Sequence, residues 1–532
     1  MDKRVCAPRL PQQSCLRIPC GASIKWRLKH CGPIFLPAAG YRNGTSSNNV
    51  GSNGNYWSSQ VNSSNVNNAW NMNFNSGNRN PDNNNNRYNG FSVRPVCRAF
   101  ASVGNDDYYD KMEKRGEKRL TYSELLADLH VAFDDARRHK GKKPYVVAFS
   151  RHLDENLRRL ADDLWTRQYV AQPSTCFMVT DPKCREVFAA QFRDRIVHHL
   201  YFNYVHEMLE RTFIADSYSC IRGRGTHYGI QRLEKHIRQE SREWTQRCFV
   251  LKLDIRGYFT HIDRKVLLDI TERRLREMFS HRLGMGDVRR WREVVDMDFV
   301  LYLTREIVLL DPTLFCRMRG SWDDWSVLPH DKSLFYSGEG RGLPIGNLTS
   351  QLFSNVYLSG YDDYMKRVLH CRHYGRYVDD SYVVSRDREF LLWVKDRAAE
   401  YLGTNLHLSL HEGKTGIVEA HRGVLFLGAY LKPHRQYVSN ETLLRMKRKL
   451  CVLGKRLERG EVSPRKAEDS INSFLGVLGH YSCWHIRRAL FADSVFARYG
   501  YFDKEYRKYI CLKSQWLYEV GRYFDSCGRQ GT

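Results

Sequence analysis

The sequence lacks several features that would place it quickly in a common class of protein. Its 15 cysteines include no C-x-x-C pair, which argues against a zinc ribbon or zinc finger. No run of 18 apolar residues occurs, which argues against a membrane-spanning helix. The basic N-terminus is not followed by the apolar core of a signal peptide. Scattered cysteines without a secretion signal are typical of reduced thiols, and they predict a cytoplasmic protein.

Acidic residues are scarce, above all in the first hundred positions. The 532 residues include 84 Lys and Arg against 59 Asp and Glu, a formal net charge of +25. Residues 1–100 hold 12 basic and 2 acidic residues, a net charge of +10, and residues 101–532 hold 72 and 57, a net charge of +15. This balance excludes an acidic solvating protein and favours a polyanionic partner, most simply nucleic acid.

Aliphatic residues are almost absent from the segment 43–89, which contains 19 Asn. A segment without apolar mass cannot build its own core, so its composition predicts a loop-rich or disordered region. Isolated aromatics with polar spacers, such as Trp57 and Trp70, favour instead pieces of a β-containing domain. Both interpretations stay open from composition alone.

From about residue 106 the pattern becomes mixed, and the fold class predicted for the chain is α+β. Apolar spacing predicts helices over residues 121–139, 151–167, 186–210, 263–280, 288–310 and 348–369. Strand-forming residues predict strands over 248–255 and 424–431 and a hairpin over 377–384, with a long loop over 311–347. Helical spacing returns after residue 440, and Ser463 followed by Pro464 predicts a helix N-terminus.

Two acidic positions stand in strand-forming surroundings. Asp254 ends an apolar run, and Asp379 with Asp380 lies between aromatic and β-branched residues. The chain has six Asp-Asp pairs, and the other five, including Asp362 with Asp363, lie in polar, loop or helical contexts. Carboxylates gathered at strand ends are suitable ligands for Mg²⁺, and two such ions can clamp both oxygens of a phosphoryl transfer.

The residues around these aspartates resemble the motifs of a reverse transcriptase. Residues 249–259 (FVLKLDIRGYF) and 377–380 (YVDD) are similar to motifs A and C. The remaining motifs follow in the expected order over about residues 110–490. They are 181–187 and 192–197 (fingers), 217–226 (before the palm), 342–351 (motif B), 411–415 (motif D) and 426–428 (motif E).

The resemblance implies a right-hand polymerase behind an Asn-rich leader. The leader would occupy residues 1–105, and we expect it to be poorly ordered. Fingers would occupy residues 106–245, and a palm with an antiparallel sheet and the catalytic motifs would occupy 246–435. A helical thumb with a C-terminal tail would occupy 436–532.

The resemblance also assigns catalytic roles. Asp254, Asp379 and the carbonyl of Ile255 would coordinate two Mg²⁺ ions, with Mn²⁺ as an alternative ion. Asp380 would support this metal site. Lys414 would be the motif D lysine, a general acid for the departing pyrophosphate.

Further residues would hold the dNTP and the nucleic acid. Lys183 and Arg185 would contact the triphosphate, although a solvated basic face is the ordinary alternative. Phe259 would be the steric gate that excludes a ribose 2′-hydroxyl, although a core aromatic is the ordinary alternative. Ile345, Gly346 and Gln351 of motif B would complete the dNTP site, and Arg195, Arg445, Arg448 and Lys449 would contact nucleic acid.

The residues of motif B indicate which kind of reverse transcriptase the chain resembles. Group II intron enzymes usually carry Gln-Gly-x-x-x-Ser-Pro, whereas this chain has Ile345 before Gly346 and Gln351 after Ser350. That pattern is similar to the reverse transcriptase of diversity-generating retroelements. Such enzymes make cDNA from a template RNA, misincorporate opposite template adenines and work with a small, basic, oligomeric accessory variability protein. Our hypothesis is that Ile345, which lacks an amide, loosens geometric checking of the incoming base.

The leader has a matching interpretation. Residues 34–40, 56–59 and 92–96 resemble the C-terminal part of a C-type-lectin-like domain. Replacing the adenines of AAC or AAT never creates a stop codon, so Asn codons suit adenine mutagenesis. We therefore interpret residues 32–98 as a template repeat read in frame with the polymerase.

Three alternatives remain open. The chain could be a group II intron or retron-like reverse transcriptase of ordinary fidelity. It could be a lectin-like ligand-binding protein whose N-terminus is the functional unit. It could also be a catalytically dead RNA-binding relic. No membrane is expected as a partner.

Overall fold

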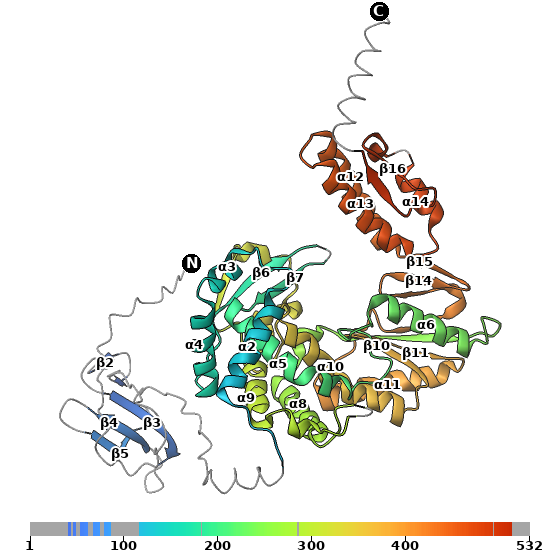
Figure 1. Ribbon diagram of the computed structural model, residues 1–532. Helices are drawn as coiled ribbons and strands as arrows, with labels where there is room; N and C mark the ends of the chain where they lie inside the picture. Colours follow the sequence, from blue (N-terminus) through green and yellow to red (C-terminus); the bar gives the residue numbers. More distant parts are fainter. Residues whose placement is uncertain are drawn as a thin grey trace, which may run out of the picture. The chain divides into compact units, whose positions relative to one another are not determined.

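The computed structural model describes two compact units, Met1–Lys111 and Met112–Thr532 (Figure 1). In the first unit it describes residues 41–43, 46–48, 54–61, 68–74 and 79–86. In the second it describes residues 116–181, 183–284, 287–492 and 494–512. Each unit is treated by itself.

The first unit contains strands where Asn-rich composition had predicted loops. Strands β1 (Tyr41–Asn43) and β2 (Ser46–Asn48) form an antiparallel pair. Strands β3 (Gly54–Val61), β4 (Asn68–Phe74) and β5 (Arg79–Asn86) form a second antiparallel sheet in the order β3-β4-β5. Backbone hydrogen bonds between neighbouring strands hold these segments together, and amino-acid composition does not reveal such pairing. The rest of the predicted leader lies outside the described residues.

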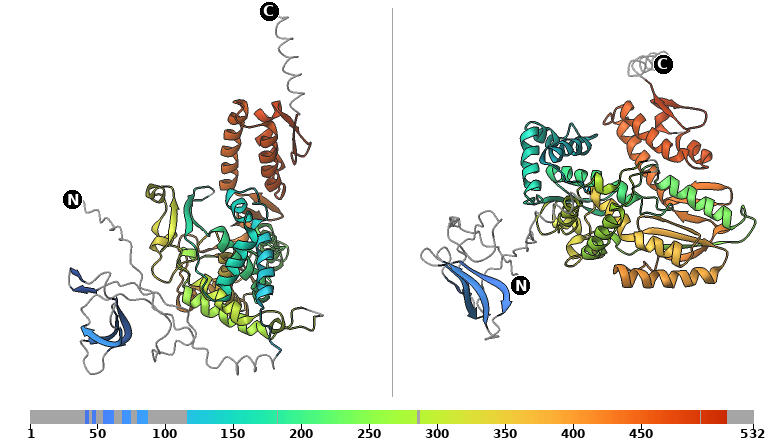
Figure 2. Two further views of the ribbon diagram at one scale, coloured as in Figure 1. Left: turned by 60° about the vertical axis from the view of Figure 1, so that its left-hand side comes forward. Right: turned by 60° about the horizontal axis from the view of Figure 1, so that its bottom comes forward.

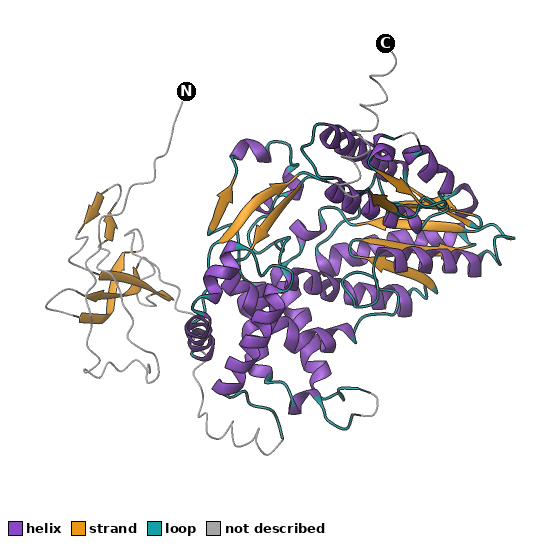
Figure 3. Ribbon diagram, turned by 45° about the horizontal axis from the view of Figure 1, so that its top comes forward, coloured by secondary structure: helices purple, strands orange, loops and turns teal. Residues whose placement is uncertain are grey.

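The second unit mixes helices and strands, so the predicted mixed class is confirmed (Figure 3). Its first part contains α2 (Tyr122–Arg137), α3 (Pro144–Ser150), α4 (Leu153–Trp165), β6 (Ser174–Val179), β7 (Arg185–Ala189), α5 (Phe192–Glu210) and α6 (Thr226–Glu240). Its middle contains β8 (Phe249–Asp254), α7 (Tyr258–His261), α8 (Arg264–Phe279), α9 (Met297–Val308), β9 (Cys316–Arg319), α10 (Leu348–Asp363), β10 (His373–Tyr377), β11 (Asp380–Ser385), α11 (Arg388–Leu406) and β12 (Gly416–Glu419). Its last part contains β13 (Val424–Phe426), β14 (Ala429–Lys432), β15 (Arg435–Val438), α12 (Asn440–Glu458), α13 (Pro464–Gly479), α14 (Trp484–Phe491), β16 (Gly500–Phe502) and β17 (Tyr509–Cys511).

A four-stranded antiparallel sheet in the order β10-β11-β8-β12 lies at the centre of this unit. Helix α6 packs on one face and α11 on the other (Figure 1). Because side chains alternate along a strand, β8 buries Val250 in the cluster that contains Leu233 of α6, and Leu251 in the cluster that contains Leu391 of α11. The sheet is therefore buried on both faces, which fixes its register.

Two of the predicted helices begin later than expected. Residues 186–189 belong to β7, which pairs with β6, and the helix begins at Phe192 after Gln191. Val187 and Phe188 fit the apolar stripe of a helix, but they belong to a strand. The helix predicted over 288–310 begins at Met297, because Asp296 caps it by accepting a hydrogen bond from the Phe299 N–H.

The C-terminal part packs around its own apolar cluster, which includes Leu450, Ile471 and Phe491. Helices α12 and α13 lie side by side (Figures 1 and 2). The Ser463 hydroxyl accepts a hydrogen bond from the Lys466 N–H, so the predicted N-terminus of α13 is confirmed. The single strand predicted over 424–431 is instead the hairpin β13–β14. It turns at Leu427 and Gly428, which both have positive φ.

Within the described residues, none of the helices is both long enough and apolar enough to cross a membrane.

Candidate active site at the ends of β8 and β11

Two of the predicted catalytic carboxylates meet where the inner strands of the four-stranded sheet, β8 and β11, end and begin. Asp254 is the last residue of β8, Asp380 is the first residue of β11, and the two are register partners in the antiparallel pair. Directly opposite residues have Cβ atoms about 4.5–5.5 Å apart and point to the same face. The fold therefore brings together two carboxylates from distant parts of the sequence.

Asp379 lies in the two-residue turn that joins β10 to β11. Tyr377 pairs with Asp380, which leaves Val378 and Asp379 as the turn. Val378 has a φ of 55°, a left-handed conformation that is rare for a β-branched residue. This conformation costs on the order of 1–3 kcal/mol and persists only where the surrounding structure enforces it. The predicted hairpin is confirmed, with Asp379 in the turn and Asp380 in the strand.

The carbonyl of Ile255 faces the same side of β8 as Asp379. The Arg256 N–H donates to the Ser409 carbonyl and the His411 N–H donates to the Asp254 carbonyl, so Ile255 sits between two cross-strand bonds. The backbone groups of a residue in this type of antiparallel bridge point away from the partner strand. The Ile255 carbonyl thus points away from Leu410 and towards the side of β11.

Burial and neighbouring charges raise the pKa of two of these carboxyl groups, Asp379 and Asp380. Burial raises the pKa of Asp379, and the charge of Asp254 adds to this effect. Burial, followed by the charges of Asp379 and Asp254, raises the pKa of Asp380 to about 7. A group of carboxylates that disfavours its own ionisation is stabilised by a cation.

Lys414 places a cation on this group. Its Nζ lies 3.1 Å from Oδ1 and 3.2 Å from Oδ2 of Asp254. The loop that carries Lys414 is attached to Asp254, because Thr415 Oγ1 accepts a bond from the Asp254 N–H at 3.4 Å. The Lys414 side chain is 57% exposed and that of Asp254 is 13% exposed. An exposed lysine can therefore leave this carboxylate without unfolding its surroundings.

The donor set suits a hard divalent ion. Asp254, Asp379, Asp380 and the Ile255 carbonyl offer only oxygen atoms, which Mg²⁺ prefers. Among the described residues, however, no three His, Cys, Asp or Glu side chains are arranged to hold an ion by themselves. An ion here would need further oxygen ligands from water or a substrate phosphate.

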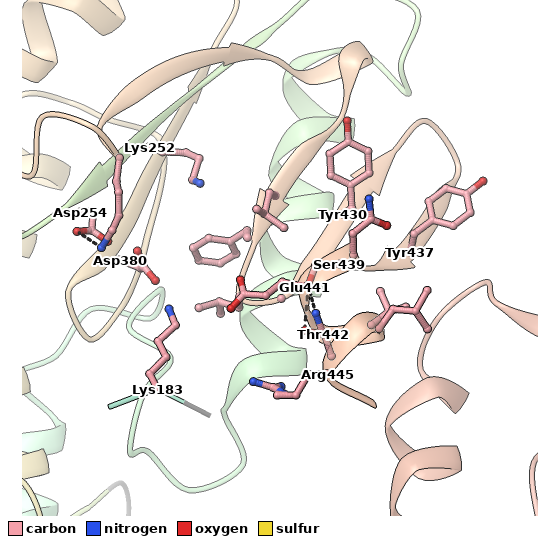
Figure 4. Close-up of a pocket in the computed structure, with 18 of the residues that line it drawn as sticks. Lys183, Lys252, Asp254, Asp380, Tyr430, Tyr437, Ser439, Glu441, Thr442 and Arg445 are labelled. Carbon is pink, nitrogen blue, oxygen red and sulfur yellow. Dashed lines mark hydrogen bonds and ion pairs between the residues drawn. The ribbon is translucent and has the colours of Figure 1, made fainter. Parts of the chain in front are cut away.

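A cavity of about 1120 Å³ opens in front of Asp254 and Asp380 (Figure 4). Lys414 also lines this cavity, and Lys183 points into it from the loop before β7 (Figure 4). Arg445 of α12 lines it as well. The cavity therefore joins acidic strand ends to basic side chains from two other parts of the unit.

Sequence reasoning missed several residues that line this cavity. They are Lys252, Tyr430, Lys432, Tyr437 and Glu441. Tyr430 and Tyr437 are register partners on β14 and β15. Recognition of the second hairpin would have been needed to place them, and the sequence predicted only one strand there.

Motif B is docked on β7. The Phe188 N–H donates to the Ile345 carbonyl at 2.9 Å, and the Ala190 N–H donates to Asn347 Oδ1 at 3.3 Å. Gly346 has a φ of 128°, and a Cβ there would lie 2.9 Å from the Phe188 carbonyl oxygen. Only glycine allows this close approach of two backbones.

Motif B is also linked to its neighbours on two further sides. The Leu343 N–H donates to the Phe259 carbonyl at 2.7 Å, which joins the predicted steric gate to motif B. His198 Nδ1 of α5 is hydrogen-bonded to Thr349 Oγ1 at 2.8 Å. Gln351 is exposed on α10.

Arg185 and Arg195, predicted to contact the triphosphate and the nucleic acid, lie in different surroundings. Arg185 begins β7, and its charge lowers the pKa of Asp379, although burial raises that pKa more. Arg195 donates to the Ala190 carbonyl at 2.7 Å and lies over the Tyr145 ring, so its guanidinium is engaged within the protein. Its predicted role in nucleic-acid binding stays a prediction.

The three α12 residues predicted to contact nucleic acid all line hollows of the surface. Arg445 lines both the main cavity and a smaller neighbouring hollow, which Arg448 and Lys449 also line. Lys449 forms an ion pair with Asp181, which belongs to the loop that carries Lys183. This pair connects α12 to that loop.

Comparisons with known proteins identify a family for a small part of the chain only. A family described as a domain of unknown function (DUF8237) matches residues 30–96. No curated protein matches the sequence.

Among solved structures, the chain is similar to telomerases from two yeasts. Apo telomerase from Candida tropicalis, truncated from its C-terminal domain, is 11% identical with a TM-score of 0.36, over 54% of this chain and 60% of that one. Telomerase from Candida albicans in complex with the TWJ fragment of telomeric RNA is 12% identical with a TM-score of 0.33, over 63% and 59%. The chain thus spans about 60% of their length. Such low identities and TM-scores assign no activity to this chain.

Proposed function

We propose that the chain is an RNA-directed DNA polymerase. The pairing of Asp254 with Asp380 across β8 and β11, beside Asp379 in the turn, is the observation that carries the proposal. The sequence motifs in reverse-transcriptase order support it, as does a cavity with basic side chains in front of Asp254 and Asp380. The residues would divide into fingers, palm and thumb as the motifs predict.

The carboxylates and the Ile255 carbonyl would hold two Mg²⁺ ions, with Mn²⁺ as an alternative. When bound, such ions activate the primer 3′-hydroxyl and neutralise charge on the transferred phosphate. Lys183 and Arg185 would attract and orient the triphosphate, since charge-assisted hydrogen bonds to phosphate are strong. Lys414, released from Asp254, would donate a proton to the departing pyrophosphate.

Substrate selection would depend on motifs A and B. Phe259 follows Asp254 by five positions, and its carbonyl accepts a bond from Leu343. In the steric-gate role its ring would exclude a ribose 2′-hydroxyl and select dNTPs. Arg445, Arg448 and Lys449 would bind template and primer phosphates, which predicts steep salt dependence.

The finer proposal is a mutagenic reverse transcriptase of a diversity-generating retroelement. Ile345 supports it, because the hydrogen bond from Phe188 fixes its backbone on β7 while its side chain has no amide to offer a base pair. Template RNA, nascent cDNA and a small basic accessory protein would be the partners, in the cytoplasm. Residues 32–98 would be a template repeat read in frame, which AAC- and AAT-rich codons and a near-copy beside another gene would support.

The test is primer extension on an adenine-rich RNA by the full chain, followed by cDNA sequencing. We expect metal-dependent cDNA with errors concentrated opposite adenine, and we expect Ile345→Gln to reduce those errors. Accurate cDNA would favour the group II intron or retron-like alternative. Absence of cDNA with metal and dNTPs would overturn both polymerase interpretations and leave the RNA-binding relic. Glycan or protein binding by residues 1–105 would favour the lectin-like alternative.

A further inference from the structure

An ion pair is completely buried beneath the turn that carries Asp379. Arg376 is 0% exposed and its partner Asp362 is 1% exposed at the side chain. Arg376 Nε donates to Asp362 Oδ1 at 2.8 Å, and Nη2 donates to Oδ2 at 2.6 Å. This two-bond geometry fixes the guanidinium plane as well as its position.

The pair is completed by neutral groups. The Tyr374 hydroxyl donates to Asp362 Oδ1 at 2.6 Å, which satisfies the carboxylate further. Arg376 Nη1 lies 3.3 Å from Asn355 Oδ1 of α10. Buried ion pairs contribute little net stability compared with apolar residues of the same shape. Stability alone therefore does not explain why Arg376 and Asp362 are buried together, and another role is expected.

The Arg376 guanidinium also bonds to the turn itself. Its Nη1 donates to the Val378 carbonyl at 2.9 Å. The Val378 N–H donates to Ser219 Oγ at 3.2 Å, and the Ser219 hydroxyl in turn donates to Asn355 Oδ1 at 3.0 Å. Both backbone groups of Val378 are thus held by side chains of one buried network.

The turn needs such support. Val378 has a φ of 55°, in the region that β-branched residues avoid. Asp379 follows it directly, so rotation of the Val378 backbone towards a relaxed conformation would re-aim the Asp379 carboxylate. The bonds from Arg376 and to Ser219 oppose that rotation.

We propose that Arg376, held by Asp362, is a positioning residue that fixes the Asp379 carboxylate through the Val378 carbonyl. Arg376 itself would not touch the reacting atoms. Ser219 completes the support from the amide side. The inference rests on the proposed function for its activity readout, whereas its metal-binding readout is independent of turnover.

The neighbouring residue Asp363 supplies a matched control. It is the second member of the same Asp-Asp pair, but it pairs with Arg274 of α8 at 2.9 Å and with Arg367 at 3.4 Å. Neither partner is bonded to the turn in the described structure. Asp362→Asn and Asp363→Asn therefore remove the same charge one position apart, with and without a connection to Val378.

The experiment measures primer extension and Mn²⁺ binding by the full chain for Arg376→Lys, Asp362→Asn, Ser219→Ala and Asp363→Asn. We expect Arg376→Lys and Asp362→Asn to lower kcat at least 100-fold and to weaken Mn²⁺ binding at least 10-fold, with little change in KM for dNTP. We expect changes of about 3–10-fold for Ser219→Ala and less than 3-fold for Asp363→Asn.

Ser219→Ala keeps the test decisive if an ion-pair variant fails to fold, because it removes only a hydroxyl. Wild-type Mn²⁺ binding by Ser219→Ala, or equal losses in Asp362→Asn and Asp363→Asn, would overturn the inference. If the wild-type chain makes no cDNA, the proposed function fails. The Mn²⁺ titrations would still decide whether Arg376 positions Asp379.

Discussion

The ammonium group of Lys414 lies within 3.2 Å of both carboxylate oxygens of Asp254. One of the clustered carboxylates is therefore already neutralised by a cation from its own chain. The same lysine would have to leave Asp254 before an ion and a triphosphate could occupy the site. Lys414 would thus have two positions, one on the carboxylate and one on the leaving group.

Replacing Lys414 tests the second of these positions. Lys414→Met should lower kcat by roughly 10²-fold with little change in KM, since general acid catalysis typically contributes at least this much. Steady-state incorporation rates at saturating dNTP and metal measure this loss. Lys432 of β14 lines the same cavity, so Lys432→Met is the control and should keep the wild-type rate. A wild-type rate in Lys414→Met would exclude the acid role.

Asp380 predicts a pH dependence of stability. Its pKa is raised to about 7, so between pH 4 and 7 the folded chain keeps a proton that the unfolded chain releases. The free energy of unfolding without metal should therefore fall as pH rises through this range, and Asp380→Asn should remove about 1–3 kcal/mol of that fall. Denaturant titrations at pH 5 and pH 8 measure both. If the free energy of unfolding of Asp380→Asn depends on pH as strongly as that of the wild type, the pH dependence comes from another group.

The proton on Asp380 should also affect the proposed metal binding. Because an ion must displace it, the Mn²⁺ affinity of the wild-type chain should rise about tenfold per pH unit up to pH 7 and then level off. In Asp380→Asn this part of the pH dependence should be lost. Isothermal titration at pH 6, 7 and 8 provides the comparison.

His198 predicts a stability that falls, not rises, as the pH decreases. Burial lowers its pKa to about 4, so between pH 6.5 and 4 the unfolded chain takes up a proton that the folded chain does not. Stability should fall as pH decreases through this window, and His198→Asn should reduce the loss between pH 7 and pH 5 by about 1–2 kcal/mol. His152, whose side chain is 71% exposed, is the control position. Equal slopes for wild type and His198→Asn would contradict the assignment.

At position 378 the glycine variant should be more stable than the alanine variant, which reverses the usual order of stability within a strand. Alanine is disfavoured at positive φ and glycine is not, so Val378→Gly should be about 1 kcal/mol more stable than Val378→Ala. The same pair of substitutions at Val383, within β11, should show the usual order with alanine the more stable. Denaturant unfolding of the four variants measures the difference. An alanine variant as stable as the glycine variant would show that the turn relaxes.

Much of the site could be predicted from local sequence. Asp254 and Asp379 stand in apolar, β-branched surroundings that few other aspartates share, so strand ends and a hairpin were predictable. Apolar spacing was less reliable at residues 186–189, because Val187 and Phe188 fit a helical stripe and a strand equally well. Their pairing with β6 decides between the two, and it is a long-range contact.

Asp362 shows what local sequence cannot provide. It belongs to an Asp-Asp pair in a helix, and nothing near it in the sequence distinguishes it from Asp363. Its significance comes from Arg376 on β10, which the fold places against it in a fully buried position. The tyrosines on β14 and β15 are a similar case, since only the second hairpin brings them to the cavity.

The most direct test of the account is incorporation of a single dNTP on an RNA template by the full chain and by Asp379→Asn. We predict metal-dependent extension by the wild-type chain and a loss of at least about 10³-fold in Asp379→Asn, because the substitution would remove a proposed ligand of the metal ions. Asp324→Asn, from another Asp-Asp pair, should extend at the wild-type rate. Extension by Asp379→Asn at the wild-type rate would contradict the assignment of the active site.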